Sequence, residues 1–139
     1  MRNDNNVVKL GEGVSVRSMT ATLNGGSLTI DNNCLIADFV NILTDGHSVI
    51  DNDTKELLNG ARADIKIGNH VWIGFGATLL KNSEIKDNCI VANSAVVTKP
   101  FEESNVVIAG NPAKIVKRGI NWNHTAPVEY SKETADFSF

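Results

Sequence analysis

Residues 67–97 read IGNHVWIGFGATLLKNSEIKDNCIVANSAVV and repeat one pattern every six residues. A large aliphatic residue opens each hexad, and the fifth position of each hexad is small or compact. The opening residues are Ile67, Ile73, Leu79, Ile85, Val91 and Val97, and the fifth-position residues are Val71, Ala77, Ser83, Cys89 and Ala95. Helices repeat every 3.6 residues and half-buried strands every two, so neither explains a period of six. Hexapeptide periodicity is typical of a parallel β-helix, in which three hexads close one triangular coil.

The pattern also runs toward the N-terminus, with two interruptions. Further opening residues are Leu10, Val16, Ile30, Ile36 and Ile42, and further fifth-position residues are Val14, Thr20, Cys34 and Val40. The turn sequence NGGS at 24–27 adds two residues and resets the phase. Residues 48–63, between His47 and Asp64, lack the period and predict a loop projecting from one corner. We therefore predict an all-β chain, a β-helix of about four to five coils, with one long loop.

The open ends of so short a solenoid expose strand edges and need a cover. At the C-terminal end, Pro112 suits the first turn of a short helix, with Ile115 and Val116 packed on the last coil. Residues 111–139 are thus predicted to form a cap and a tail. We expect the tail aromatics Trp122, Tyr130, Phe137 and Phe139 to pack on a neighbouring subunit.

Length and composition favour one domain spanning 1–139. A net charge of −3 gives no reason to expect a nucleic-acid partner. No stretch is apolar enough for membrane insertion, and the start MRNDNN is unlike a signal peptide, so we expect a cytoplasmic protein. Cys34 and Cys89 occupy inward positions and are interpreted as small buried hydrophobes without a disulfide.

Residues 65–122 resemble the hexapeptide-repeat acyltransferases. The matching pieces are IGNHVWIG at 67–74, AVVTK at 95–99 and VIAGNPAK at 107–114. The resemblance is to the branch of maltose, galactoside and antibiotic acetyltransferases, and KRGINW at 117–122 is similar to acetyltransferases of capsule and lipopolysaccharide assembly. It implies a left-handed β-helix, a homotrimer, acetyl-CoA as the donor without a metal, and a carbohydrate acceptor.

Acetyl transfer to a hydroxyl needs a group that removes the hydroxyl proton, and a neutral imidazole does this near pH 7. His47 ends the hexad ILTDGH and stands where the family carries its catalytic base. Either Asp45 or a backbone carbonyl is expected to orient this imidazole. We interpret His70 as a solvated surface residue and assign His124 no role. Since both cysteines point inward and no serine has a nucleophile's setting, we predict direct attack in a ternary complex.

The resemblance also places coenzyme A. By the period Trp72 faces outward, where it contacts either the pantetheine arm or another subunit. A backbone N–H near Gly74 and Phe75 is the predicted oxyanion donor, although Phe75 replaces the small polar residue common in relatives. Cations near the last coil suit the phosphates, although Lys117 fits a solvated helix end equally well. The predicted coenzyme A residues are Trp72, Gly74, Phe75, Asn93, Thr98, Lys99, Pro112, Lys114 and Arg118.

Two other functions remain open from the residues. In a non-catalytic structural or binding β-helix, His47 and the long loop would have no function. A metal-dependent hydratase of the γ-carbonic-anhydrase kind needs three histidines converging on zinc, and His47, His70 and His124 lack the close pair that such a site uses. The acceptor itself, whether surface glycan, free sugar or antibiotic, and O- versus N-acetylation are not distinguished by any residue.

Overall fold

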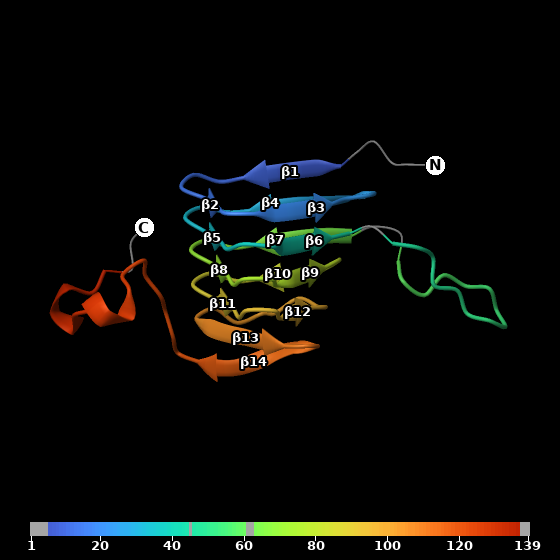
Figure 1. Cartoon of the computed structure of the whole chain (residues 1–139). Helices are drawn as coiled ribbons and strands as arrows, with labels where there is room; N and C mark the ends of the chain where they lie inside the picture. Colours follow the sequence, from blue (N-terminus) through green and yellow to red (C-terminus); the bar gives the residue numbers. More distant parts are fainter. Residues whose placement is uncertain (1–5, 45, 61–62, 137–139) are drawn as a thin grey trace.

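A computed structural model describes residues 6–44, 46–60 and 63–136. Its strands form three sheets that are the faces of a triangular prism, with one strand from each sheet in every coil (Figure 1). The first sheet holds β1 (Val7–Leu10), β4 (Gly26–Ile30), β7 (Ala63–Ile67) and β10 (Glu84–Ile85). The second sheet holds β2 (Ser15–Val16), β5 (Leu35–Ile36), β8 (Trp72–Ile73), β11 (Ile90–Val91), β13 (Val106–Gly110) and β14 (Ala113–Arg118). The third sheet holds β3 (Met19–Thr22), β6 (Val40–Leu43), β9 (Thr78–Leu80) and β12 (Val96–Val97).

The register between coils confirms the period of six. Glu84 of β10 lies opposite Lys66 of β7, a step of 84 − 66 = 18 residues, or three hexads. Ser27 of β4 lies opposite Val7 of β1, a step of 27 − 7 = 20, which contains the two extra residues predicted for the turn at 24–27. Ala63 lies opposite Gly26, a step of 63 − 26 = 37, because the long loop is inserted within this coil. Four complete coils and the start of a fifth result.

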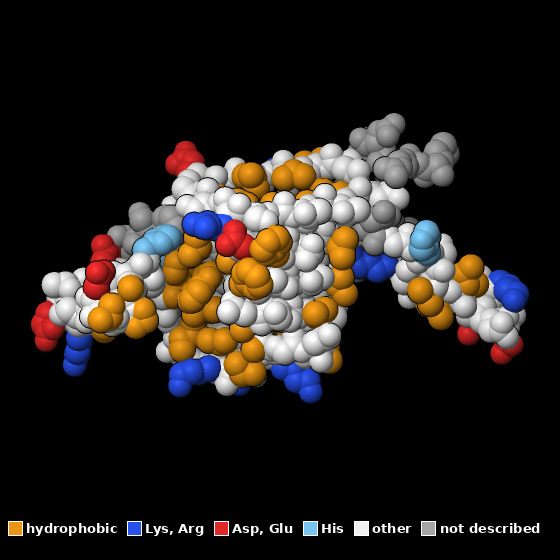
Figure 2. Space-filling view, in the orientation of Figure 1, with side chains coloured by type: hydrophobic (Ala, Val, Ile, Leu, Met, Phe, Trp, Pro, Cys, Tyr) orange, Lys and Arg blue, Asp and Glu red, His pale blue; other side chains and the backbone are white. Residues whose placement is uncertain are grey.

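The core is the one predicted from the repeat. Every opening residue and fifth-position residue from Ile30 to Val97 is at most 1% exposed. The first coil differs, because no coil covers its outer end: Leu10 is 54% and Val16 43% exposed. Figure 2 shows hydrophobic side chains at that end of the prism. The repeat therefore identifies inward residues correctly, but burial also requires a neighbouring coil on each side.

The corner between the first and second sheets, called the first corner, is built from residues that tolerate a left-handed backbone. Asn33, His70, Asn88 and Asn105 occupy it in successive coils with φ between 54° and 62°. Beside them runs a ladder of side-chain caps, in which the backbone N–H of Asn69 donates to Asp87 Oδ1 at 2.7 Å. The left-handed positions are thus mainly asparagine, and beside them Asn32, Asn69 and Asp87 accept from the preceding coil.

The C-terminal cover is a strand, which corrects the predicted short helix. β14 pairs antiparallel with β13, and Pro112 lies in the turn between them. Pairing satisfies the backbone groups that the last coil would otherwise leave at an open edge, which a helix cannot do. Among the described residues the only helical segments are the 3₁₀ turns η1 (Pro127–Glu129) and η2 (Lys132–Thr134), and no helix there is long and apolar enough to span a bilayer.

The long loop leaves the prism after β6 and returns at β7, and we call its described part, residues 46–60, the arm (Figure 1). An antiparallel bridge joins Ile50 to Leu57, and Asp51 Oδ1 accepts from the N–H groups of Asp53 and Thr54 at 3.0 and 2.7 Å. Those bonds lower the pKa of Asp51, with Thr54 the larger cause. The apolar residues of the arm stay 48–62% exposed: Val49, Ile50, Leu57 and Leu58.

Candidate active site

His47 lies at the third corner, between the third and first sheets, where the arm leaves the prism. Its backbone carbonyl accepts from Asn59 Nδ2 at 2.7 Å, and Asn59 Oδ1 accepts from Val49 N–H at 3.0 Å. Lys81, from the next coil at the same corner, donates to the Asn59 carbonyl. These three contacts fasten the exposed histidine to both the arm and the prism.

A cavity of about 480 Å³ opens beside His47. Asn24 and Lys81 line it from neighbouring coils, and Leu57 lines it from the arm. Thr44, 6% exposed, is held there because its Oγ1 accepts from Asn24 N–H at 3.1 Å. Asp45, predicted to orient His47, lies outside the described residues, so its role stays a prediction. His47 therefore lines a cavity of mixed polar and apolar residues, where an imidazole can act as a general base.

Trp72 and Phe75 lie elsewhere in the chain. Trp72 projects from β8 on the outer face of the second sheet and is 37% exposed. Phe75 follows at the second corner, between the second and third sheets, with its ring 5.5 Å from that of Phe39 in an edge-to-face contact. Figure 1 shows β8 and the arm on opposite sides of the prism, so one copy does not bring His47 to Trp72.

The N–H groups predicted as oxyanion donors are already used within the prism. Gly74 N–H donates to the Val91 carbonyl at 2.7 Å, and Phe75 N–H donates to Asn93 Oδ1 at 2.9 Å. A Cβ at position 74 would meet Asn93 Oδ1 at 2.5 Å, which explains the glycine. Asn93 therefore serves first as a corner cap, and its Nδ2 group remains as a donor beside Phe75.

The predicted phosphate-binding cations do not form one cluster. Lys99 follows β12 at the third corner, whereas Lys114 pairs with Ala109 near the second corner. Arg118 pairs with Val106 at the other end of β14, which is about 13 Å from Lys114 at the usual rise per strand residue. Thr98 is exposed beside Lys99, and Pro112 is exposed in the turn before β14.

The cations also differ in their partners. Arg118 donates to both carboxylate oxygens of Glu103, at 2.8 and 3.1 Å, and this pair lowers the pKa of Glu103 and raises that of Arg118. Within the described part of the chain, no carboxylate comes within 4.0 Å of the Lys99, Lys114 or Lys117 ammonium groups. Lys99 and Lys114 are therefore better placed than Arg118 to meet a phosphate.

His70 is buried, which corrects its interpretation as a solvated residue. It is 7% exposed, and its Nδ1 lies 3.0 Å from Asn88 Oδ1. Its ring stacks on Trp122 at 4.2 Å, and Trp122 Nε1 donates to the His70 carbonyl at 2.9 Å. Trp122 thus packs on its own chain, whereas we had expected it on another subunit. Of the other tail aromatics, Tyr130 is 50% exposed, and Phe137 and Phe139 lie outside the described residues.

Sequence reasoning missed Asn59 and Lys81, which hold His47, and the corner role of His70. The Asn59-Gly60 pair reads only as a turn, and nothing in the letters shows that its amide returns to His47. A signal did exist for His70, because it precedes Asn88 by one coil of 18 residues and occupies the same corner position.

Comparison with known proteins places the chain in a family. The family model described as bacterial transferase hexapeptide (six repeats) matches residues 64–99. A polysialic acid O-acetyltransferase of Escherichia coli O1:K1 is 36% identical over 104 residues, which are 74% of this chain and 33% of that protein. This chain therefore spans about a third of that relative's length.

Solved structures agree with the sequence matches. The polySia-specific acetyltransferase NeuO has a TM-score of 0.83 at 30% identity, covering 91% of this chain and 59% of that one. The polysialic acid O-acetyltransferase OatWY has a TM-score of 0.65 at 32% identity, covering 92% and 67%. A galactoside acetyltransferase in complex with coenzyme A has a TM-score of 0.67 at 25% identity, covering 81% and 58%. The chain belongs to the hexapeptide-repeat acetyltransferases and shares their left-handed parallel β-helix.

Proposed function

We propose that this protein is an acetyl-CoA-dependent O-acetyltransferase that modifies a hydroxyl of a sugar or glycan, with His47 as the general base. Relatives named as polysialic acid and galactoside O-acetyltransferases support the reaction class. The neighbour solved with coenzyme A supports the donor. The position of His47 in the lining of a cavity at the third corner supports the base.

The observation that carries the proposal is the distribution of the site over two corners. His47, Lys81 and Lys99 lie at the third corner. Phe75, Asn93 and Lys114 lie at the second corner, with Trp72 beside them. A cyclic assembly that packs the third corner of one copy against the second corner of the next completes a site that neither copy contains alone. We therefore propose a homotrimer with an active site at each of three interfaces.

This interface provides the groups that coenzyme A requires. Its phosphates need cations, which Lys99 from one copy and Lys114 from the next supply. Its long pantetheine arm needs an apolar surface with a few polar contacts, which Trp72, Phe75 and the Asn93 amide supply. The apolar side chains of the protein's own arm, residues 46–60, are about half exposed in one copy. A neighbouring subunit would cover them.

In the proposed reaction acetyl-CoA supplies an activated acetyl thioester. His47 holds the acceptor hydroxyl and removes its proton as the new C–O bond forms and the C–S bond breaks. The proton then passes from the imidazolium to the departing thiolate, so that the base is regenerated. Asn59 keeps the histidine backbone in place throughout.

The test is the substitution His47→Ala in an acetyl-transfer assay with a panel of sugar acceptors. We expect kcat to fall by roughly 10²–10⁴-fold, the usual contribution of a general base, with coenzyme A binding unchanged. Asn52→Ala, in the exposed turn of the arm and outside the cavity lining, is the control and is expected to keep wild-type kcat. Near wild-type turnover in His47→Ala would remove this histidine from the mechanism. A wild-type protein that binds coenzyme A and glycans but transfers nothing would favour a binding β-helix.

A further inference from the structure

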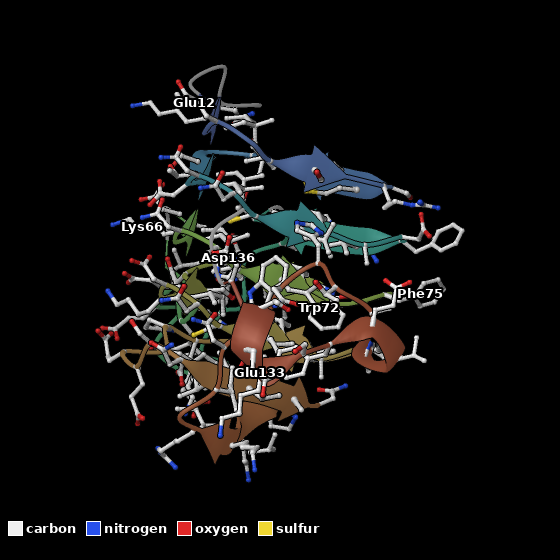
Figure 3. The ribbon with its side chains drawn as sticks, turned by 90° about the vertical axis from the view of Figure 1, so that its left-hand side faces the viewer. Glu12, Lys66, Trp72, Phe75, Glu133 and Asp136 are labelled. Carbon is white, nitrogen blue, oxygen red and sulfur yellow. The ribbon has the colours of Figure 1, made fainter. Side chains whose placement is uncertain are left out.

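A second cavity, of about 620 Å³, lies on the outer face of the second sheet, beneath the C-terminal tail. Leu35, Trp72 and Ile90 form its floor, since they lie side by side on β5, β8 and β11. Residues 121–125, Pro127 and Tyr130 of the tail supply its walls. In Figure 3 the tail crosses in front of the second sheet and Trp72 lies beneath it. We call this cavity the tail pocket.

The aromatic walls of the tail pocket are held at a fixed angle. Trp122, 6% exposed, is fixed by its stacking on His70 and by the bond from its Nε1 to the His70 carbonyl. The ring of Trp72 lies 6.0 Å from that of Trp122 at an interplanar angle of 50°. Tyr130 also lines the pocket and is half exposed. The pocket therefore presents two aromatic side chains that the fold leaves partly uncovered, Trp72 and Tyr130.

Polar groups accompany these aromatic side chains. Asn121 Oδ1 accepts from Trp122 N–H at 2.9 Å, and Asn123 Oδ1 accepts from Thr125 N–H at 3.1 Å. Each amide is thus fixed through its oxygen, and within the described chain neither Nδ2 group donates to a protein acceptor. The hydroxyls of Thr125 and Tyr130, which also line the pocket, are in the same situation.

This combination fits a pyranose ring. A sugar ring has an apolar face of C–H groups, which packs on an indole or phenol, and hydroxyls at its edge that pair with amides and hydroxyls. The volume is within the range of small-ligand pockets. Among the described residues the lining contains no lysine or arginine that could pair with the phosphates of coenzyme A.

We propose that the tail pocket is an acceptor subsite, which binds a sugar unit beyond the one that is acetylated. The subsite rests on the proposed function, because Trp72 belongs both to the tail pocket and to the proposed transfer site. A glycan that reacts at the interface would then extend over Trp72 into the tail pocket. The subsite would select oligosaccharides over single sugars.

The experiment compares acceptor chain lengths in the wild-type protein and in Tyr130→Ala. Sialic acid and its oligomers form one series, and glucose and maltooligosaccharides form a neutral series. We expect Tyr130→Ala to raise KM for the accepted oligomer about tenfold, the equivalent of one stacked aromatic contact. KM for acetyl-CoA and for the single sugar should stay within about twofold. Val128→Ala, 91% exposed on the same 3₁₀ turn and outside the lining, is the matched control.

A second measurement separates this proposal from the proposed function. Trp72 and Trp122 report binding by fluorescence, so His47→Ala can be titrated with both series in the absence of turnover. We expect oligomers of one series to change the emission, and Tyr130→Ala to weaken that response. Binding without transfer in the wild-type protein would overturn the enzyme and keep the subsite. Equal effects of Tyr130→Ala on all acceptor lengths, or no fluorescence response to either series, would overturn the subsite.

Discussion

Asn59 is the residue that joins the arm to the candidate base, because its amide bonds both the His47 carbonyl and Val49 N–H. We expect Asn59→Ala to lower kcat about 10–100-fold, since a displacement of about 1 Å is enough for such a loss. Asn52→Ala, exposed in the turn of the same arm, is the control. A lower melting temperature with unchanged kcat would assign Asn59 to stability alone.

The buried thiol of Cys34 makes the free energy of unfolding depend on pH. Burial raises the pKa of its thiol from 9.0 to about 11, and the S–H group donates to the Gly68 carbonyl at 3.0 Å. The folded state therefore favours the neutral thiol, so this contribution is complete below pH 9 and is lost as pH rises through 11. We expect the free energy of unfolding to fall by on the order of 2 kcal/mol over that range. Urea titrations at several pH values measure the free energy of unfolding of wild type and Cys34→Ala. The same change of this free energy with pH in both proteins would contradict the prediction.

At the scale of single residues, the sequence predicts what the period controls. Ile73 and Cys89 are identified as inward because their positions repeat, and both are fully buried. His70 shows the limit. Its burial depends on Trp122, which lies 52 residues away and beyond the last hexad. A local pattern carries no information about such a contact.

Among the elements, the hairpin of β13 and β14 determines which of its cations can contact acetyl-CoA in the proposed site. Lys114 lies at the second corner, whereas Arg118 is engaged by Glu103 at the first. We expect Lys99→Ala and Lys114→Ala each to raise KM for acetyl-CoA about tenfold, the value of one exposed charge-assisted bond. One of the two lysines is expected to bind the 3′-phosphate. Its replacement should change KM little for acetyl-CoA that lacks this phosphate.

Arg118→Ala is the matched control for these lysines, with an expected KM close to wild type because its guanidinium is already paired. Steady-state assays with both donors provide the comparison. If Arg118→Ala proves the most damaging of the three, the assignment of the phosphates to the interface between corners is wrong.

The same hairpin shows why the sequence predicts the strands of the repeat but not the last strand, β14. Each hexad specifies its strand, because inward and outward residues alternate with corners at fixed intervals. The last segment has no repeat, and Pro112 suits both a helix start and a hairpin turn. The unpaired edge of β13 decides between them, and this edge exists only once the coils are stacked.

For the whole molecule, the two-corner site predicts complementation between inactive subunits. His47→Ala and Trp72→Ala damage opposite sides of each proposed interface. When equal amounts are unfolded together and refolded, about one quarter of the interfaces of a cyclic trimer should combine an intact His47 with an intact Trp72. Activity should thus rise to about one quarter of wild type. The separately refolded variants, mixed afterwards, are the control, and an absence of rescue would place both residues in one subunit's site.

The step between β4 and β7 has a further consequence. These strands pair as consecutive coils although 37 residues separate partners, 19 more than the regular 18. The arm is therefore a loop inserted into the stack of coils, and the pairing of the prism strands holds its two ends close together. Closing such a loop costs conformational entropy that grows only with the logarithm of its length, so doubling it adds about 0.6 kcal/mol. The arm, which lines the cavity beside His47, can therefore lengthen, shorten or change sequence at almost constant stability. If His47 acts as proposed, acceptor preference can diverge through this loop while the prism stays the same.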